Sequence, residues 1–195
     1  MHQERLTMRK LKRATSAAVV VAALAGTTAI TAATPAAAAD YKCTTSKKSV
    51  DDPSYSGPWA DNWDFTVKVC AKRSGSTVYS YAKISWDGPA YGQVDDSTIF
   101  DSAYFKVQIK KSQSGTDPVK KSKNFYGIEA KLENSDSNGN YNNSYTTGTI
   151  SYQIGSSKGL GDGELHLDWD SDGGGDQKHL FSASPSPRPL LEPIW

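Results

Sequence analysis

The sequence predicts an all-β protein, folded as an antiparallel β-sandwich of about seven strands. Apolar and polar residues alternate over several short runs, which is the pattern of strands with one buried face. Clusters of Gly, Pro, Asn, Asp and Ser separate these runs at regular intervals, as turns between strands do. No segment shows a convincing helical period. The immunoglobulin fold is one arrangement that fits this pattern, and a small β-barrel is the alternative.

The expected strands follow one another along the chain. The clearest alternation lies over residues 63–71 and 78–86, which we expect to pair as a hairpin across the Ser74-Gly75 turn. A short edge strand is expected before them. The complete set of expected strands is 41–45, 63–71, 78–86, 104–110, 125–133, 144–154 and 164–169.

Residues 1–39 are predicted to be a secretory signal peptide. Residues 1–13 carry five Lys or Arg and one Glu, and no charged residue follows until Asp40. A basic start, a short apolar segment and small residues at the end are typical of export signals. We therefore expect cleavage near Ala39 and a secreted, extracellular protein. A retained membrane helix is the alternative, but the Ala- and Thr-rich composition and Pro35 disfavour it, so no stable membrane anchor is expected.

Residues 40–172 are expected to form a single domain, and residues 173–195 a flexible tail. The tail begins with three Gly and contains four Pro, a composition typical of flexible or extended segments. Without residues 1–39 the chain carries 17 Lys or Arg and 20 Asp or Glu, a net charge of −3. A mildly acidic, exported domain is not expected to bind nucleic acid.

Cys43 and Cys70 are the only cysteines of the chain. In an exported protein, two cysteines most simply form one disulfide bond. The two cysteines do not form a C-x-x-C motif and neither has a His nearby in the sequence, so a redox or nucleophilic role is not expected. Cys70 falls on the polar face of its expected strand. We therefore expect the bond to join an edge strand to its neighbour rather than to cross the core.

Residues 168–173 carry the clearest motif with metal-binding character, and residues 134–139 a weaker one that a hairpin turn explains better. The sequence Asp-Trp-Asp-Ser-Asp-Gly matches the start of a calcium-binding loop, in which alternate carboxylates converge on one cation. The twelfth position of that loop is His179 rather than Glu, and neither flank looks helical. A solvated acidic strand end is therefore the preferred interpretation, with calcium as the alternative cofactor. The ligands of such a site are Asp168, Asp170, Asp172 and Asp176, with Glu164 as a further candidate.

Tyrosines are the candidates for ligand binding. Tyr79 and Tyr81 occupy the expected outer face of one strand, and Tyr141 and Tyr145 flank an Asn-rich loop. Exposed rings beside amides and carboxylates can stack on sugar rings, which suits a secreted carbohydrate-binding module. Tyr is also a common strand former that tolerates half-burial, so a structural role is the simpler interpretation. The same set includes the loop aromatics Tyr55, Trp59 and Tyr91.

A run of six lysines lies between residues 106 and 123. A basic face attracts anionic partners. Lysines at outward strand positions more often prevent unwanted edge pairing, and we prefer that interpretation for this run.

Catalytic signatures are weak in this sequence. It contains no G-x-S-x-G, H-E-x-x-H or P-loop motif, and only His166 and His179 remain after the expected leader. We therefore expect a secreted, non-catalytic binding or interaction domain whose ligand is an extracellular glycan or a protein. A calcium-stabilised sandwich that acts as an accessory module or inhibitor is the second hypothesis. A hydrolase without a local motif is the third.

Overall fold

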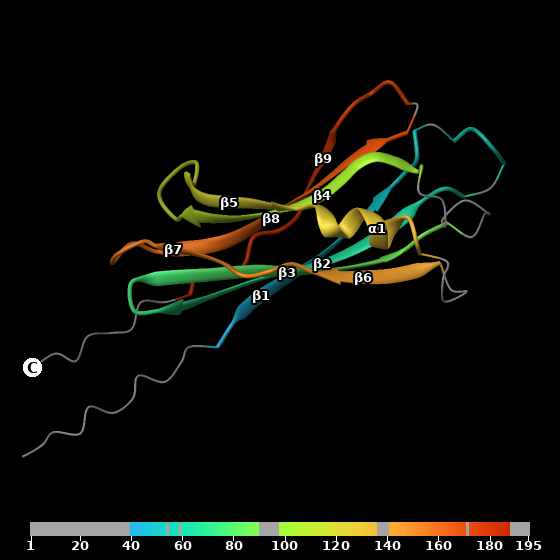
Figure 1. Ribbon diagram of the computed structural model, residues 1–195. Coiled ribbons are helices and arrows are strands. Elements are labelled where there is room, and N and C mark those ends of the chain that lie inside the picture. The colour runs from blue at the N-terminus through green and yellow to red at the C-terminus, as the bar shows by residue number, and fades with distance from the viewer. Residues whose placement is uncertain are drawn as a thin grey trace, which may run out of the picture. The chain divides into compact units, whose positions relative to one another are not determined.

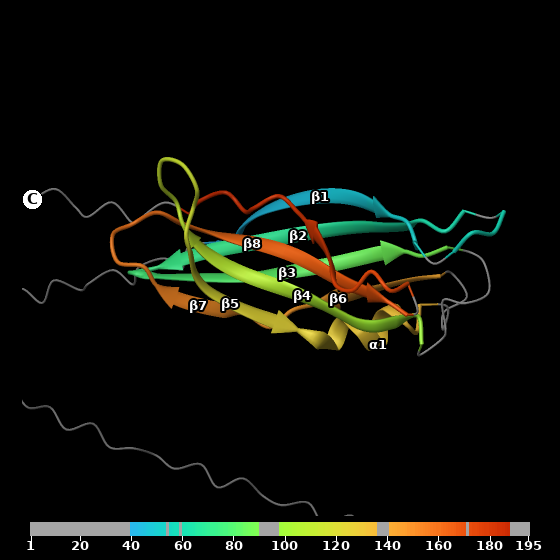
Figure 2. The ribbon, with the colours of Figure 1, turned by 90° about the horizontal axis from the view of Figure 1, so that it is seen from above.

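Two antiparallel sheets stack face to face with the hydrophobic core between them (Figures 1 and 2). The structure is a computed structural model, which describes residues 40–53, 55–58, 60–89, 98–135, 141–170 and 172–187. The predicted β-sandwich is confirmed, and the two sheets do not close into the alternative barrel. The described part contains nine strands rather than about seven. The predicted leader, residues 1–39, lies outside the described residues.

Sheet A has the strand order β1-β2-β3-β6, and β7 also pairs with β3. Its strands are β1 (Lys42–Val50), β2 (Trp63–Ser74), β3 (Thr77–Asp87), β6 (Asn142–Thr146) and β7 (Ile150–Gln153). The three strands β1 to β3 follow one another in this one sheet. In an immunoglobulin domain the third strand lies in the opposite sheet. The strand connectivity of this sandwich therefore differs from that of the immunoglobulin fold.

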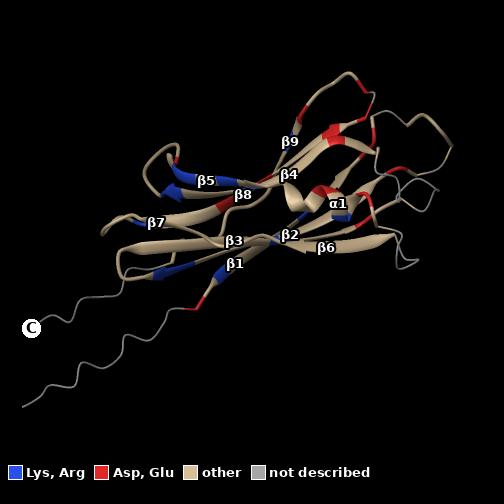
Figure 3. Cartoon of the chain, in the orientation of Figure 1, with Lys and Arg blue, Asp and Glu red and all other residues tan. Residues whose placement is uncertain are grey.

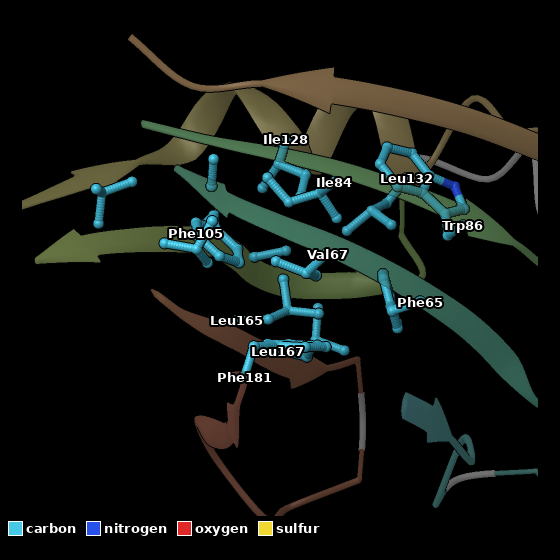
Figure 4. Close-up of a cluster of buried hydrophobic side chains, with 14 of the residues drawn as sticks. Phe65, Val67, Ile84, Trp86, Phe105, Ile128, Leu132, Leu165, Leu167 and Phe181 are labelled. Atoms are coloured by element: carbon cyan, nitrogen blue, oxygen red, sulfur yellow. The ribbon is translucent and has the colours of Figure 1, made fainter. Parts of the chain in front are cut away.

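Sheet B has the order β5-β4-β8-β9. Its strands are β4 (Phe100–Lys111), β5 (Val119–Phe125), β8 (Gly159–Trp169) and β9 (Gln177–Leu180). Alternate residues of both sheets point inward, including Phe65 of β2, Phe105 of β4 and Leu165 of β8, all completely buried or nearly so (Figure 4). The backbone of β8 lies so close to these side chains that a Cβ at Gly163 would come within 2.6 Å of the Phe105 ring.

Residues 126–132 are helical, which corrects the strand predicted over 125–133. A 3-10 turn, η1 (Tyr126–Ile128), leads into the short helix α1 (Glu129–Leu132). The apolar Ile128 and Leu132 are four residues apart, a spacing that fits one helix face as well as alternate strand positions. Both side chains are completely buried and point into the core (Figure 4). Strong helix formers between them decide the outcome.

The single strand predicted over 144–154 is divided into β6 and β7. Between them, the Thr147 backbone N–H donates to the Ala82 carbonyl at 2.9 Å. The Thr147 hydroxyl oxygen in turn accepts from the Ala82 N–H at 2.9 Å. The Thr147 side chain thus takes the Ala82 N–H of β3 as its partner, which interrupts the backbone hydrogen bonds between β3 and its neighbouring strand.

Residues 177–187 belong to the folded domain, although they fall in the segment expected to be a flexible tail. After β9, Phe181 is buried against the core. The Ser184 N–H donates to the Gly161 carbonyl at 2.8 Å, and its hydroxyl accepts from the Gly161 N–H at 2.9 Å. The Ser182 N–H donates to the Ser46 hydroxyl of β1 at 3.2 Å. The segment therefore connects β8 of one sheet to β1 of the other.

Candidate functional site: the outer face of sheet A

The predicted disulfide bond between Cys43 and Cys70 is confirmed. The two residues lie directly opposite each other on β1 and β2. Cys70 alternates with the core residues Val69 and Ala71 and points away from the core. The bond therefore ties the edge strand β1 to β2 on the outer face of sheet A, as the polar-face position of Cys70 predicted, and Cys70 itself is completely covered there.

The outer face of sheet A consists of the side chains that alternate with core residues on its strands. Strand pairing arranges them in rows across the sheet, because directly opposite residues share a face. The rows run from a polar end through a lysine row to an aromatic end. They are Ser49–Asp64–Asp87–Asn142, Lys47–Thr66–Ser85–Ser144, Thr45–Lys68–Lys83–Thr146, Cys43–Cys70–Tyr81 and Lys72–Tyr79–Ser151.

Tyr79 and Tyr81 lie at the aromatic end of this face, as predicted. Both rings are half-buried, and each leaves part of its surface accessible. The Tyr41 ring packs edge-on against Tyr81, with ring centroids 4.8 Å apart. The Lys72 ammonium lies 4.8 Å from the Tyr41 centroid and 5.7 Å from that of Tyr79, within cation–π range. These contacts hold three rings and one cation in a fixed patch.

The polar end of the face is hollowed into a shallow groove of about 970 Å³. Its lining includes hydroxyl, amide, carboxylate and ammonium groups from β1, β2, β3 and β6. The Ser49 hydroxyl donates to Asp64 Oδ1 at 2.6 Å, and the Asn62 amide donates to the Ser49 hydroxyl at 3.0 Å. Groups of this kind match the hydroxyls of a polar ligand, whereas an apolar ligand would leave them unpaired.

Lys68 of β2 and Lys83 of β3 occupy directly opposite positions in the middle of the same face. Both side chains are exposed. The ion pairs of the described residues involve Lys106, Lys110 and His166, and neither Lys68 nor Lys83 takes part in one. Blue segments on β1 and β2 mark the basic residues of this region (Figure 3). Sequence reasoning did not single out this pair, although the two residues lie equally far from the hairpin turn that the Ser74–Thr77 pair closes.

Tyr141 and Tyr145 are not part of this face. Tyr145 lies opposite Ile84, a core residue of β3, and therefore points to the inner side of sheet A. Both tyrosines pack against the hydrophobic core. The structure thus separates the four predicted ligand-binding tyrosines into an outer pair and an inner pair. The loop aromatics Trp59 and Tyr91 lie outside the described residues.

The predicted calcium ligands are spread along the end of β8 and the loop that follows. The Asp172 carboxylate accepts from the Gly174 N–H at 2.6 Å, and Asp176 contacts sheet B instead. Burial, and then the charges of Asp101, Asp172 and Asp176, raise the pKa of Asp168. Among the described residues, no group of three or more His, Cys, Asp or Glu side chains is arranged to hold a metal ion. The carboxylates predicted as calcium ligands, on Asp168, Asp170, Asp172 and Asp176, therefore form no such group.

A second cluster lies on the outer face of sheet B, around His166. His166 is only 6% exposed. The Tyr104 ring stacks on it at a centroid distance of 4.4 Å. His166 Nδ1 lies 3.0 Å from Asp176 Oδ2, and its Nε2 lies 3.2 Å from Glu164 Oε2. The Lys106 ammonium donates to the same Glu164 oxygen at 3.0 Å.

This cluster shifts the pKa values of Tyr104 and Glu164. Burial, and then the hydrogen bond to Asp176 and its charge, raise the pKa of Tyr104 to about 12. Burial alone would raise the pKa of Glu164, but hydrogen bonds from Lys106 and His166 outweigh it, so that pKa lies below its ordinary value. Both ring nitrogens of His166 are engaged by carboxylates. The cluster therefore joins β4, β8 and the segment before β9, and leaves no ring nitrogen of His166 for a substrate.

No family model, curated protein or solved structure matches the chain. In the part of the chain that the structure describes, no helix has the length and apolar composition needed to span a bilayer.

Proposed function

We propose that the chain is a secreted, non-catalytic binding domain, and that its ligand is an extracellular glycan held on the outer face of sheet A. The observation that carries the proposal is the position of Tyr79 and Tyr81, which share this face with the polar groove. Partly accessible aromatic rings offer flat apolar surfaces to sugar rings. The groove supplies donors and acceptors for sugar hydroxyls.

The disulfide bond supports secretion, because such bonds form and persist in oxidising compartments. The engagement of His166 supports a non-catalytic role. A general base needs a free lone pair within hydrogen-bond reach of the substrate, and both His166 nitrogens face carboxylates within its own cluster.

A glycan array tests the proposal, with the wild type compared with the double variant Tyr79→Ala/Tyr81→Ala. We expect the wild type to bind a defined set of glycans and the double variant to lose at least ten-fold in affinity for each. Tyr126→Ala is the matched control, because Tyr126 is a 58% exposed tyrosine that packs on Tyr104 of sheet B. Equal binding by the double variant, or an equal loss in the control, would contradict the proposal.

A further inference from the structure

We propose that the glycan bound on sheet A is acidic, and that Lys68 and Lys83 together bind a carboxylate carried by its sugar rings. This inference rests on the proposed function and names the class of its ligand. The pairing of β2 with β3 brings these two lysines to directly opposite positions on the same outer face.

The arrangement is costly for the protein alone. Opposite residues on neighbouring antiparallel strands have Cβ atoms about 4.5–5.5 Å apart, and like charges there are destabilising. The nearest outward carboxylates on these two strands, Asp64 and Asp87, are two rows away. Two rows correspond to about 13 Å between backbone positions along a strand, and neither carboxylate forms an ion pair with Lys68 or Lys83 in the described part of the chain. They therefore do little to neutralise the lysine pair.

Edge protection does not explain the pair either. Lysines often occupy edge strands, where they prevent pairing with other chains. The lysines Lys120, Lys121 and Lys123 fit that role, because they are exposed on the edge strand β5 (Figure 3). Lys68 and Lys83 instead lie on β2 and β3, each of which has a neighbouring strand on both sides.

A carboxylate between the two ammonium groups would turn the repulsion into two charge-assisted hydrogen bonds. The neighbouring row suits a sugar ring that carries such a group. Tyr81 precedes Lys83 by two residues, so its ring lies on the same face about one row away. A hexuronate ring stacked on Tyr81 with its carboxylate-bearing edge toward Lys83 would therefore bring that carboxylate to the lysine pair.

The test compares polygalacturonate, alginate and hyaluronate with their methyl esters, in which the sugar rings are unchanged and the charge is removed. We expect the wild type to bind at least one acid form ten-fold or more tightly than its ester. In Lys68→Gln/Lys83→Gln we expect this preference to disappear. The matched control, Lys120→Gln/Lys121→Gln, removes the same charge from sheet B and should keep the preference.

The outcomes separate this inference from the proposed function. If acid and ester bind equally, and Tyr79→Ala/Tyr81→Ala weakens both, the acidic ligand is wrong and the glycan-binding face stands. If the preference survives in Lys68→Gln/Lys83→Gln, the lysine pair is not the carboxylate site. Binding of a DNA duplex in place of all three polysaccharides would also overturn the inference.

Discussion

Lys68 and Lys83 lie directly opposite each other on β2 and β3, and neither forms an ion pair with a carboxylate of the described residues. In the proposed function, this pair makes stability and ligand binding oppose each other. Two like charges in opposite positions weaken the sheet, while the same two charges form the centre of the proposed binding face.

Replacing Lys83 by Glu should therefore stabilise the fold and abolish acidic-glycan binding. The new pair with Lys68 has opposite charges, and we expect the free energy of unfolding to rise by about 0.2–1 kcal/mol at low salt. Urea unfolding measures this change. Lys83→Gln, which only removes the repulsion, should give a smaller increase, and a decrease in stability for Lys83→Glu would contradict the account.

The disulfide bond should contribute substantially to stability. Cys43 and Cys70 are 27 positions apart in the sequence, and a loop of this size is expected to stabilise a domain by about 2–4 kcal/mol through the entropy of the unfolded chain. The variant Cys43→Ser/Cys70→Ser should lose this amount in urea unfolding. Dithiothreitol should destabilise the wild type and leave the variant unaffected. A loss well below 1 kcal/mol would show that β1 is held by other contacts.

His179 should make the fold less stable as the pH falls below about 6.5. Burial, and then the charges of Lys48 and His166, lower the pKa of this imidazole, against the opposing charge of Asp176. Its Nε2 is buried without a hydrogen-bond partner among the described residues. The unfolded chain therefore binds more protons than the folded one below the ordinary value of 6.5, and stability decreases with falling pH.

The variant His179→Gln isolates this effect. Between pH 7.5 and 5, its free energy of unfolding should fall less than that of the wild type. The lowered pKa of Glu164 acts in the same direction, but only below its ordinary value of 4.5, outside this range. Identical pH dependence in the two proteins would show that His179 does not contribute.

Calcium should leave the melting temperature unchanged. The Asp172 and Asp176 carboxylates already accept hydrogen bonds, from Gly174 and from Tyr104 respectively. A cation would have to replace these bonds before it gained its own ligands. Thermal melting in millimolar calcium and in excess chelator checks this, and a clear rise in melting temperature with calcium would restore the metal site.

Strands β2 and β3 of sheet A were predictable because their alternation is long and regular. Residues 63–71 and 78–86 determine both the core face and the outer face, and Cys70 falls on the correct side. The helical structure around Ile128 and Leu132 was not predictable, because an apolar spacing of four residues fits a strand and a helix equally. Strand β9 was not predicted because its sequence has no apolar alternation. Its place in sheet B comes from its pairing with β8, which the sequence pattern does not reveal.

The candidate site was only partly predictable for a related reason. The outward position of Tyr79 and Tyr81 follows from strand alternation alone. The burial of His166 depends on Asp176 and Tyr104, which approach it through the fold rather than through a sequence motif. Tyr145 was assigned to a loop flank, and the pairing of β6 with β3 turns it inward.

Nuclear magnetic resonance mapping of glycan binding tests the central claim most directly. Backbone amide shifts of the wild-type domain would be recorded during titration with a glycan found on the array. The account predicts that the largest changes cluster on β2 and β3, around Tyr81, Lys83 and Ser85. Changes centred instead on Tyr104 and His166, with β2 and β3 unaffected, would contradict it.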